Sequence, residues 1–354
     1  MGVSSLYNKY IFCNVWKQTF IANWDEIMDY AFAARLNSFK VNPDKYWIGK
    51  NGKVTVLDVL ERAATVKGLN AVDLNYPDHV EGQTEEAISD KLKELNVQLN
   101  GYAMRYYTDP GFKIGAFTNP DPKVRRAAID LTKEGIDSLV KAGGSLMTLW
   151  MGQDGFDYSF QADYAALWDM TVEAIREIAD HNPSVDISIE YKPNEPRCHS
   201  LMPDVATTLL AIKDIGRPNL GVTLDFAHVL YADEMPAYAA TLVAKHSRLL
   251  GVHLNDGYSK RDDGLMVGSV HPIQTIELLY VLDRIGYKGA IYFDTFPDTT
   301  GLDPVGECGV NISSVKAMRR VVERLKANEF LAAAIQQQDA VASQAIVQAA
   351  LYGA

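Results

Sequence analysis

Short apolar runs alternate with longer helical stretches along most of this chain. Segment 124–144 repeats its apolar residues every three to four positions and then ends at a glycine pair, which predicts an amphipathic helix. Between such segments lie apolar runs of about seven residues, which are typical of buried parallel strands. We expect eight strands, at residues 10–16, 69–75, 97–104, 145–151, 185–191, 220–226, 249–255 and 290–296.

This alternation predicts an α/β fold with a single (β/α)8 TIM barrel. A doubly wound sheet is the alternative, but the sequence lacks the glycine-rich phosphate loop that normally follows its first strand. We therefore expect a TIM-barrel catalytic domain over residues 1–320. Residues 321–354 are rich in Ala and Gln and only weakly amphipathic, so we expect a C-terminal helical tail that packs on the barrel or on a neighbouring subunit.

Composition and charge narrow the class of partner. The 354 residues include 34 Lys and Arg against 45 Asp and Glu, a formal net charge of −11. This charge disfavours nucleic acid and anionic membranes, so we expect a small-molecule ligand. The three cysteines form no CxxC pair, which disfavours a disulfide framework or a thiolate zinc site, and no secretion signal is evident. We expect a cytoplasmic homodimer or homotetramer.

Each of the last four expected strands carries one potential metal ligand near its C-terminal end. These residues are Glu190, Asp225, His253 and Asp294. Active sites of TIM barrels lie at this end of the strands, and buried carboxylates are costly unless they are paired or bind a cation. Three carboxylates and one imidazole suit Mn²⁺, Mg²⁺ or Co²⁺. The alternative is a buried network of ion pairs and hydrogen bonds without a metal.

Other charged residues near these ligands suggest further chemistry. Lys192 follows Glu190 by two residues, so its ammonium is expected to point into the same mouth and stabilise negative charge on a substrate oxygen. A salt bridge from Lys192 to Glu190 or Glu195 is the alternative. His228, Asp262 and Asp263 could together bind a second, weaker cation.

Aromatic residues lie at the ends of three expected strands or in the loops that follow them. They are Trp16, Tyr107 and Trp150. Rings in such places stack on the C–H faces of sugars or simply pack in the core.

Four segments resemble the xylose isomerase family, in the same order and with similar spacing. They are residues 115–130, 149–155, 189–197 and 262–268. The sequence EYKPNEPR is the most specific, because its Glu190 and Lys192 match that family's metal-ligand Glu and catalytic Lys. The resemblance covers nearly the whole chain and implies one tight metal site, one weaker metal site and aromatic substrate walls. It places Glu190, Asp225, His253 and Asp294 at the structural metal, His228 and Asp262 at the catalytic metal, and Trp16, Tyr107 and Trp150 at the walls.

Several positions depart from this family's pattern. Asn75 stands where the family has its ring-opening His, although Asp78 matches the supporting Asp, and Gly264 replaces a carboxylate ligand of the second metal. The ligand set itself is closer to that of L-rhamnose isomerases. Ketose 3-epimerases resemble it too, but they carry Glu in place of Asp294 because that carboxylate moves a proton.

The resemblance implies a metal-dependent aldose–ketose isomerase that acts on a small non-phosphorylated sugar by a metal-assisted hydride shift. The catalytic residues would be Lys192, Glu190, His228 and Asp262, and Asn75 would contact the substrate. With Asn75 in this position, the substrate is expected to be short, branched or open-chain, or His79 opens the ring. Two alternatives stay open: a ketose 3-epimerase that transfers protons, and a sugar-binding relative with impaired catalysis. The net charge of −11 opposes a metal-dependent endonuclease of the same barrel class.

Overall fold

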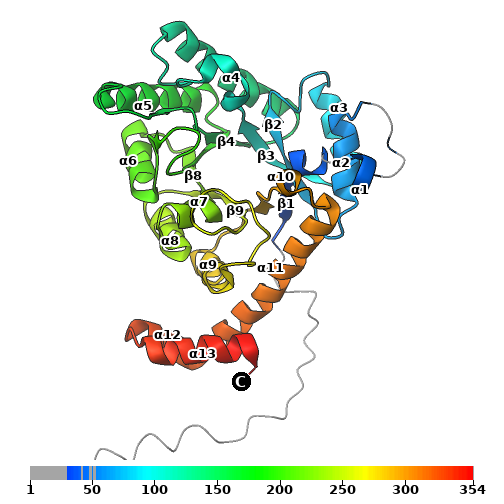
Figure 1. The fold of residues 1–354 in the computed structure, drawn as a ribbon, viewed down its shortest axis with the longest axis vertical. Coiled ribbons are helices and arrows are strands. Elements are labelled where there is room, and N and C mark those ends of the chain that lie inside the picture. Colours follow the sequence, from blue (N-terminus) through cyan, green and yellow to red (C-terminus); the bar gives the residue numbers. More distant parts are fainter. Residues whose placement is uncertain (1–29, 41–42, 48–49, 51–52, 354) are drawn as a thin grey trace, which may run out of the picture. The chain divides into compact units, whose positions relative to one another are not determined.

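Eight parallel strands close into a barrel, and helices surround it (Figure 1). The computed structural model describes residues 30–353 except 41–42, 48–49 and 51–52. The barrel order is β1-β10-β9-β8-β6-β4-β3-β2. The strands are β1 (Phe32–Arg35), β2 (Ala71–Tyr76), β3 (Gln98–Met104), β4 (Leu146–Trp150), β6 (Asp186–Glu190), β8 (Leu220–Asp225), β9 (Leu249–Leu254) and β10 (Ile291–Phe293). The predicted TIM-barrel fold is confirmed.

The first barrel strand is the one whose position was predicted wrongly. The apolar run 10–16 lies outside the described residues, and β1 is instead the short segment Phe32–Arg35. Ala33 of β1 pairs in parallel with Tyr292 of β10 and with Ala71 of β2, so this strand closes the barrel. Alanine is depleted from strands, and a four-residue run containing two alanines carries little strand signal in the sequence.

The helices lie on the outside of the barrel and follow its strands in turn. The longer ones are α2 (Val56–Ala64), α3 (Glu85–Leu95), α4 (Pro122–Lys141), α5 (Tyr164–His181), α6 (Val205–Ile215), α8 (Pro236–His246), α9 (Pro272–Ile285) and α11 (Pro304–Lys326). Most begin at a side-chain cap: Thr84 accepts from Ala87 N in α3, and Asp121 accepts from Lys123 N in α4. Helix α3 ends at Asn96 in the left-handed conformation, a position that Asn tolerates.

Short elements lie in the loops between strands and helices. They are η2 (Leu36–Lys40), α1 (Pro43–Tyr46), η3 (Tyr106–Thr108), η4 (Pro110–Phe112), α7 (Phe226–Tyr231), α10 (Pro297–Thr300) and a two-stranded sheet of β5 (Gly155–Phe156) and β7 (His199–Ser200). Helix α7 begins directly at the end of β8, where Asp225 caps it by accepting from His228 N at 3.0 Å. This connection places Asp225 and His228 next to each other at the C-terminal end of the barrel.

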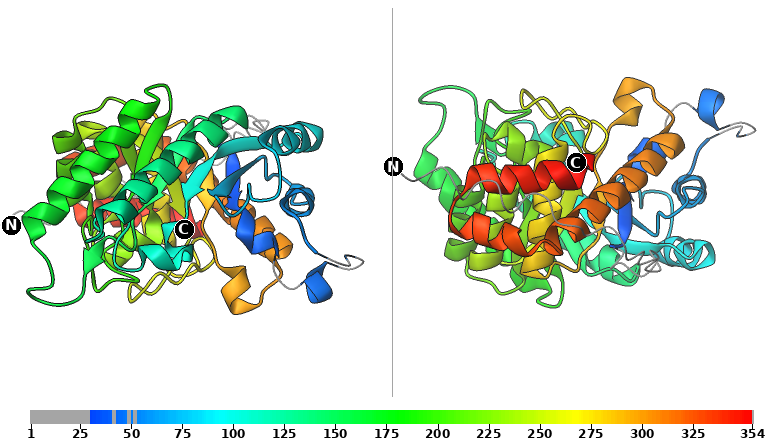
Figure 2. Two further views of the ribbon diagram at one scale, coloured as in Figure 1. Left: turned by 90° about the horizontal axis from the view of Figure 1, so that it is seen from above. Right: turned by 90° about the horizontal axis from the view of Figure 1, so that it is seen from below.

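The C-terminal residues form helices, as predicted. After α11 come α12 (Glu329–Gln336) and α13 (Ala340–Tyr352), which fold back beside α11 (Figure 2). Arg324 of α11 donates to the carbonyl oxygen of Ala350 through Nε at 3.0 Å and Nη2 at 2.6 Å. Because α11 continues through residue 320, the division into residues 1–320 and 321–354 stays a prediction. No helix in the described part of the chain is long and apolar enough to cross a membrane.

Candidate active site

A cavity of about 330 Å³ opens at the C-terminal ends of the barrel strands. Its lining combines charged side chains with apolar and aromatic ones and contains residues from most of the strands. The Arg, Lys, His, Asp and Glu members are Arg35, Arg105, Glu190, Lys192, Glu195, His228, His253, Asp262 and Asp294. Such a concave site at this face of a TIM barrel is the expected position for catalysis.

The structure brings the four predicted metal ligands together. Glu190 ends β6, Asp225 ends β8, His253 lies in β9, and Asp294 directly follows β10. Strand register contributes to this convergence, since Asp225 is the direct partner of His253. One ligand atom from each of the four residues lies within 4.8 Å of the others. Their assignment as ligands stays a prediction, but the geometry that it requires is present.

The surroundings of the His253 imidazole indicate whether these four side chains could bind a cation. Its Nδ1 is buried and has no hydrogen-bond partner among the described residues. The nearest carboxylate oxygens are Oε1 of Glu190 at 3.5 Å and Oδ2 of Asp225 at 3.9 Å. A buried nitrogen without a hydrogen bond is costly, and coordination of a divalent cation would satisfy it together with the carboxylates. The donor set therefore fits a divalent metal.

The carboxylates draw positive charge into the cluster. Burial opposes the charged form of His253, but Glu190, Asp294 and Asp225 outweigh it and raise its pKa to about 9. Burial also raises the pKa of Asp225 to about 7. A divalent cation supplies the positive charge that such a cluster attracts.

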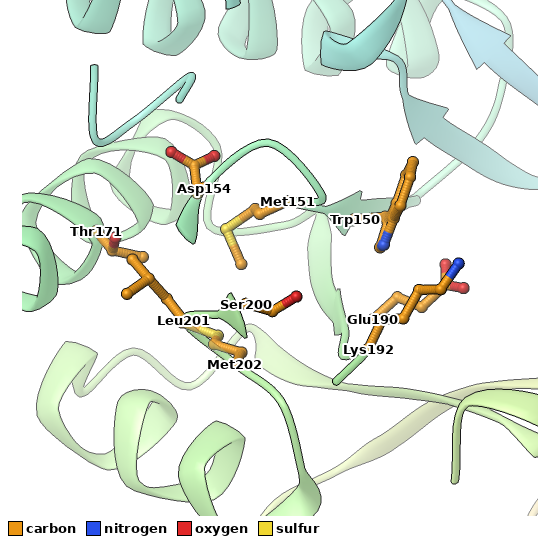
Figure 3. Close-up of a pocket in the computed structure, with 9 residues that line it drawn as sticks. All are labelled: Trp150, Met151, Asp154, Thr171, Glu190, Lys192, Ser200, Leu201 and Met202. Carbon is orange, nitrogen blue, oxygen red and sulfur yellow. The ribbon is translucent and has the colours of Figure 1, made fainter. Parts of the chain in front are cut away.

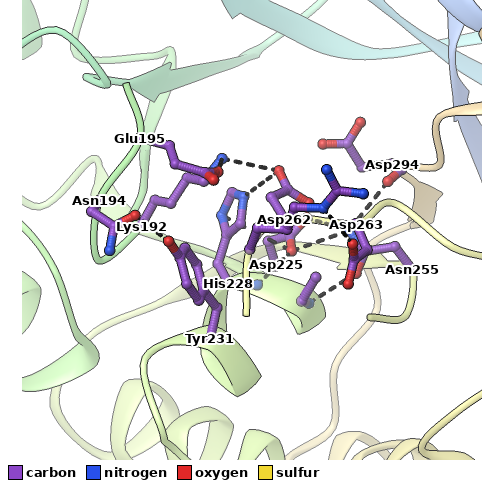
Figure 4. A network of polar contacts seen from close by, with 12 residues as sticks. Lys192, Asn194, Glu195, Asp225, His228, Tyr231, Asn255, Asp262, Asp263 and Asp294 are labelled. Atoms are coloured by element: carbon purple, nitrogen blue, oxygen red, sulfur yellow. Dashed lines mark hydrogen bonds and ion pairs between the residues drawn. The ribbon is translucent and has the colours of Figure 1, made fainter. Parts of the chain in front are cut away.

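Asn255 holds two of the predicted ligands in place, and it was not predicted (Figure 4). Its Nδ2 donates to Oδ1 and Oδ2 of Asp225 at 3.2 and 3.1 Å and to the carbonyl oxygen of Asp294 at 3.1 Å. Its Oδ1 accepts from Ala227 N at 2.8 Å. The side chain is fully buried, so Asn255 links strands β8, β9 and β10 at the cluster.

Lys192, His228 and Asp262 form a second group beside the cluster (Figure 4). Lys192 Nζ donates to Asp262 Oδ2 at 3.1 Å and lies 3.0 Å from Glu195 Oε2. His228 Nε2 donates to the same Asp262 oxygen at 3.1 Å, and Nδ1 donates to the carbonyl oxygen of Tyr191 at 3.0 Å. The salt bridge from Lys192 to Glu195, weighed as an alternative, is thus present, while Lys192 also lines the cavity.

The surroundings keep this second group charged. Burial opposes the charge on Lys192, but Asp262 and Glu195 raise its pKa above the ordinary value. Burial acts against His228 in the same way, yet Asp225 and Asp262 raise its pKa to about 9. Lys192 is therefore a fixed ammonium that can donate hydrogen bonds into the cavity.

A carboxylate side chain at position 264, which the second metal site of the family would require, does not fit in this structure. Gly264 has φ of +57°, and a Cβ added there would lie 2.2 Å from Cδ2 of Phe296. Asp263, the neighbouring carboxylate, accepts instead from Tyr258 N at 2.8 Å and from Arg261 Nε at 2.7 Å. The second metal would thus have Asp262 and His228 as protein ligands. Oδ1 of Asp262 has no hydrogen-bond partner within the described residues and is available for this purpose.

Two of the three aromatic residues predicted to line the substrate site contact each other at the cavity. The rings of Tyr107 and Trp150 lie edge to face, with their centroids 5.2 Å apart. Lys192 Nζ lies 5.4 Å from the centre of the Trp150 ring, and Figure 3 shows Lys192 and Glu190 extending toward this ring. Trp16 lies outside the described residues. A small adjoining cavity of about 10 Å³ reaches past Trp150 to Asp154 and Thr171 (Figure 3).

Asn75 lines the cavity, but its side chain contacts an arginine. With the amide oriented so that its oxygen faces donors, Oδ1 accepts from Arg105 Nη2 at 2.9 Å, from Arg105 Nε at 3.1 Å and from Asn37 Nδ2 at 2.9 Å. His79, which was suggested as a ring-opening residue in place of the family's His, does not line this cavity. Its Nδ1 accepts from Asn75 N at 3.0 Å, and its Nε2 hydrogen-bonds to Asn37 Oδ1 at 2.5 Å. Burial lowers the pKa of His79 to about 3.

Sequence reasoning missed several cavity and support residues. Arg35 was not predicted to line the cavity, because the first strand was expected at residues 10–16 and not at Phe32–Arg35. Arg105 and Asn255 directly follow β3 and β9, so a rule that examines the first residue after each strand would have found both.

The family model and the sequence relatives that match this chain agree on one family. Residues 60–327 match the family described as xylose isomerase-like TIM barrel. Xylose isomerase of Thermus thermophilus is 30% identical over 209 residues, covering 57% of this chain and 54% of the relative. Xylose isomerase of Thermus caldophilus is 28% identical over 241 residues, covering 64% of this chain and 62% of the relative. The chain thus spans between half and two thirds of the length of these relatives.

Solved structures with the same fold include sugar epimerases. An L-ribulose 3-epimerase superposes with a TM-score of 0.64 at 17% identity, covering 85% of this chain and 99% of the other. A family 2 AP endonuclease from Brucella melitensis gives a TM-score of 0.59 at 17% identity, covering 78% of this chain and 96% of the other. Identities this low show a shared fold only. The sequence match over residues 60–327 covers more than half of the chain, and this protein therefore belongs to the xylose isomerase-like TIM barrel family.

Proposed function

We propose that this protein is a divalent-metal-dependent aldose–ketose isomerase that acts on a small non-phosphorylated sugar. One observation carries the proposal: four ligand atoms lie within 4.8 Å of one another, and three of the four residues line the cavity that Lys192 also lines. The family and the xylose isomerases among its relatives support it. We further propose a cytoplasmic homodimer or homotetramer.

The metal would be held by the side chains at the ends of the last strands. Glu190, Asp225, His253 and Asp294 would form the tight site, and their oxygen-rich set favours Mn²⁺ first, with Mg²⁺ or Co²⁺ as alternatives. His228 and Asp262 would contribute to a second, weaker site. When bound, the cation supplies Lewis-acid polarisation of adjacent sugar oxygens.

The protein's own residues would orient the substrate and move a proton. Lys192, kept charged by Asp262 and Glu195, would donate a hydrogen bond to the substrate carbonyl oxygen and stabilise the negative charge that develops there. Hydrogen would pass with its electron pair between C2 and C1. Asp262, whose Oδ1 has no hydrogen-bond partner in the described part, would take the proton of the neighbouring hydroxyl, with His228 orienting it, and would return that proton to the former carbonyl oxygen after the hydrogen has moved. Trp150 and Tyr107 would cover the sugar chain.

A ketose 3-epimerase is the second candidate. Similar folds with this name, including an L-ribulose 3-epimerase, favour it, although at 17% identity they show only the fold. Such an enzyme would remove a proton from C3 with Glu190 and return one from the opposite side with Asp294. Burial raises the pKa of Asp294, and Arg35, whose Nε lies 3.8 Å from Asp294 Oδ1, opposes this shift only in part. The side chain of Asp294 is shorter than the Glu expected in ketose 3-epimerases, and this difference opposes the role.

One experiment separates the candidates. C4 to C6 aldoses and ketoses would be incubated in D₂O with Mn²⁺, Mg²⁺ or Co²⁺ and followed by proton NMR, with an EDTA-treated sample as control. Metal-dependent aldose–ketose conversion without deuterium uptake is the expected result. Deuterium at C3 would identify the epimerase instead. No conversion with any sugar and metal would favour a sugar-binding relative with impaired catalysis.

A further inference from the structure

Two arginines and one lysine line the cavity, and their charges are not equally compensated. Arg35 Nη1 is paired with Asp298 Oδ1 at 2.8 Å, and Lys192 Nζ is paired with Asp262 Oδ2 at 3.1 Å. Arg105 has no carboxylate within salt-bridge distance among the residues that the structure describes. The cavity thus contains one guanidinium whose charge is left for a ligand to neutralise.

Arg105 is held in a defined orientation. It directly follows β3, and its Nη2 and Nε donate to Oδ1 of Asn75 at 2.9 and 3.1 Å. Its guanidinium carbon also lies 4.9 Å from the centre of the Tyr107 ring. The amide of Asn75 is neutral, so it orients the guanidinium without cancelling its charge. The remaining N–H groups make no hydrogen bond to the described residues and are free to contact a ligand.

We propose that Arg105 binds a carboxylate of the substrate, so that the enzyme acts on open-chain sugar acids. This inference rests on the proposed isomerase function. A planar guanidinium matches a carboxylate in shape and in charge. A phosphate would carry nearly two negative charges, and the described lining holds no second uncompensated cation to receive it.

The role of Asn75 is consistent with an open-chain substrate. The resemblance predicts a ring-opening His at this position, but Asn75 hydrogen-bonds to Arg105 instead. A site that binds a terminal carboxylate of an open chain has no need of a ring-opening group. At about 330 Å³ the cavity is at the small end of ligand sites, which suits a short acid.

Binding of matched inert ligands tests the proposal. D-xylonate, L-arabinonate and D-ribonate would be compared by calorimetry with the corresponding pentitols, using full-length protein loaded with Mn²⁺. Each pair differs only by a carboxylate in place of a hydroxymethyl group, and neither member can be isomerised. At least one acid should bind about 10- to 100-fold more tightly than its pentitol. Arg105→Met should abolish this preference, whereas Arg105→Lys should retain part of it.

Arg284→Met is the matched control, because Arg284 also lies over an aromatic ring, Tyr280, but on the outer helix α9. It should leave the preference intact. Equal binding of acids and pentitols, no binding of any acid, or a preference that survives Arg105→Met would overturn the carboxylate site.

Turnover distinguishes this outcome from failure of the proposed function. Conversion of neutral aldoses with a KM that Arg105→Met leaves unchanged would keep the isomerase and overturn the inference. Acids that bind through Arg105 without being converted under any metal would keep the carboxylate site and overturn the isomerase.

Discussion

Nδ1 of His253 lies 3.5 Å from Oε1 of Glu190, and it makes no hydrogen bond to any described residue. Two buried groups that face each other in this way are stabilised when a cation lies between them. We therefore expect Mn²⁺ to raise the free energy of unfolding, by about 2.7 kcal/mol at a concentration 100 times its Kd. Thermal unfolding with Mn²⁺ and with EDTA measures this. Glu190→Gln should reduce the Mn²⁺-induced shift in Tm, and an identical Tm with and without Mn²⁺ would contradict the predicted site.

Asn255 is expected to position the ligands without contacting the substrate. Asn255→Ala removes the donor to both oxygens of Asp225, so it should weaken Mn²⁺ binding and lower the free energy of unfolding by about 1–3 kcal/mol. Asn219→Ala is the control, because Asn219 is also a buried amide and donates to the carbonyl oxygens of Ala179 and Val185, away from the metal cluster. The control should lose stability but keep its Mn²⁺ affinity. Equal Mn²⁺ affinity in both variants would show that Asn255 has only a structural role.

Lys192→Met should lower kcat much more than it affects metal binding. The ammonium is predicted to stabilise charge in the transition state, and loss of one such donor typically reduces kcat by about 100- to 1,000-fold. Steady-state kinetics on the substrate found by the sugar screen measure kcat, and calorimetry measures Mn²⁺ binding. A variant with near-normal kcat would assign Lys192 to the salt bridges with Asp262 and Glu195 alone.

The stability of the barrel at acid pH should depend on Asp58. This carboxylate caps α2 through Thr55 and pairs with Lys50, and these contacts lower its pKa from the ordinary 3.8 to about 2. A lowered pKa in the folded state gives stability that is complete above the unfolded pKa and is lost as the pH falls from about 4 to about 2. Asp58→Asn should therefore cost about 0.5–2 kcal/mol at pH 7 and much less at pH 2.

Denaturant unfolding at the two pH values checks this prediction. Thr84→Ala, which removes the cap of α3, is the comparison because a hydroxyl does not titrate in this range. Its loss of stability should be similar at both pH values. If Asp58→Asn shows the same pH-independent loss, the charge of Asp58 does not contribute.

Much of the cluster could be predicted because it depends on local pattern. Glu190 and Lys192 are visible as charged residues at the end of an apolar run, and the same is true of Asp225. Once a parallel barrel is inferred, the ends of its strands must meet at one face, so these residues can be placed together without coordinates. Trp16 stays a prediction, since it lies outside the described residues.

The sequence by itself therefore determined the barrel, the helical tail and the set of candidate metal ligands at the strand ends, because these follow from hydrophobic periodicity and from the cost of burying charge. The tertiary structure decided which segment closes the barrel as β1, and with it the presence of Arg35 in the cavity. It also decided that Asn75 of β2 meets Arg105 after β3 and that Asp262 pairs with both Lys192 and His228. Such contacts join residues that are far apart in the chain, and side-chain orientation, which periodicity does not encode, determines them.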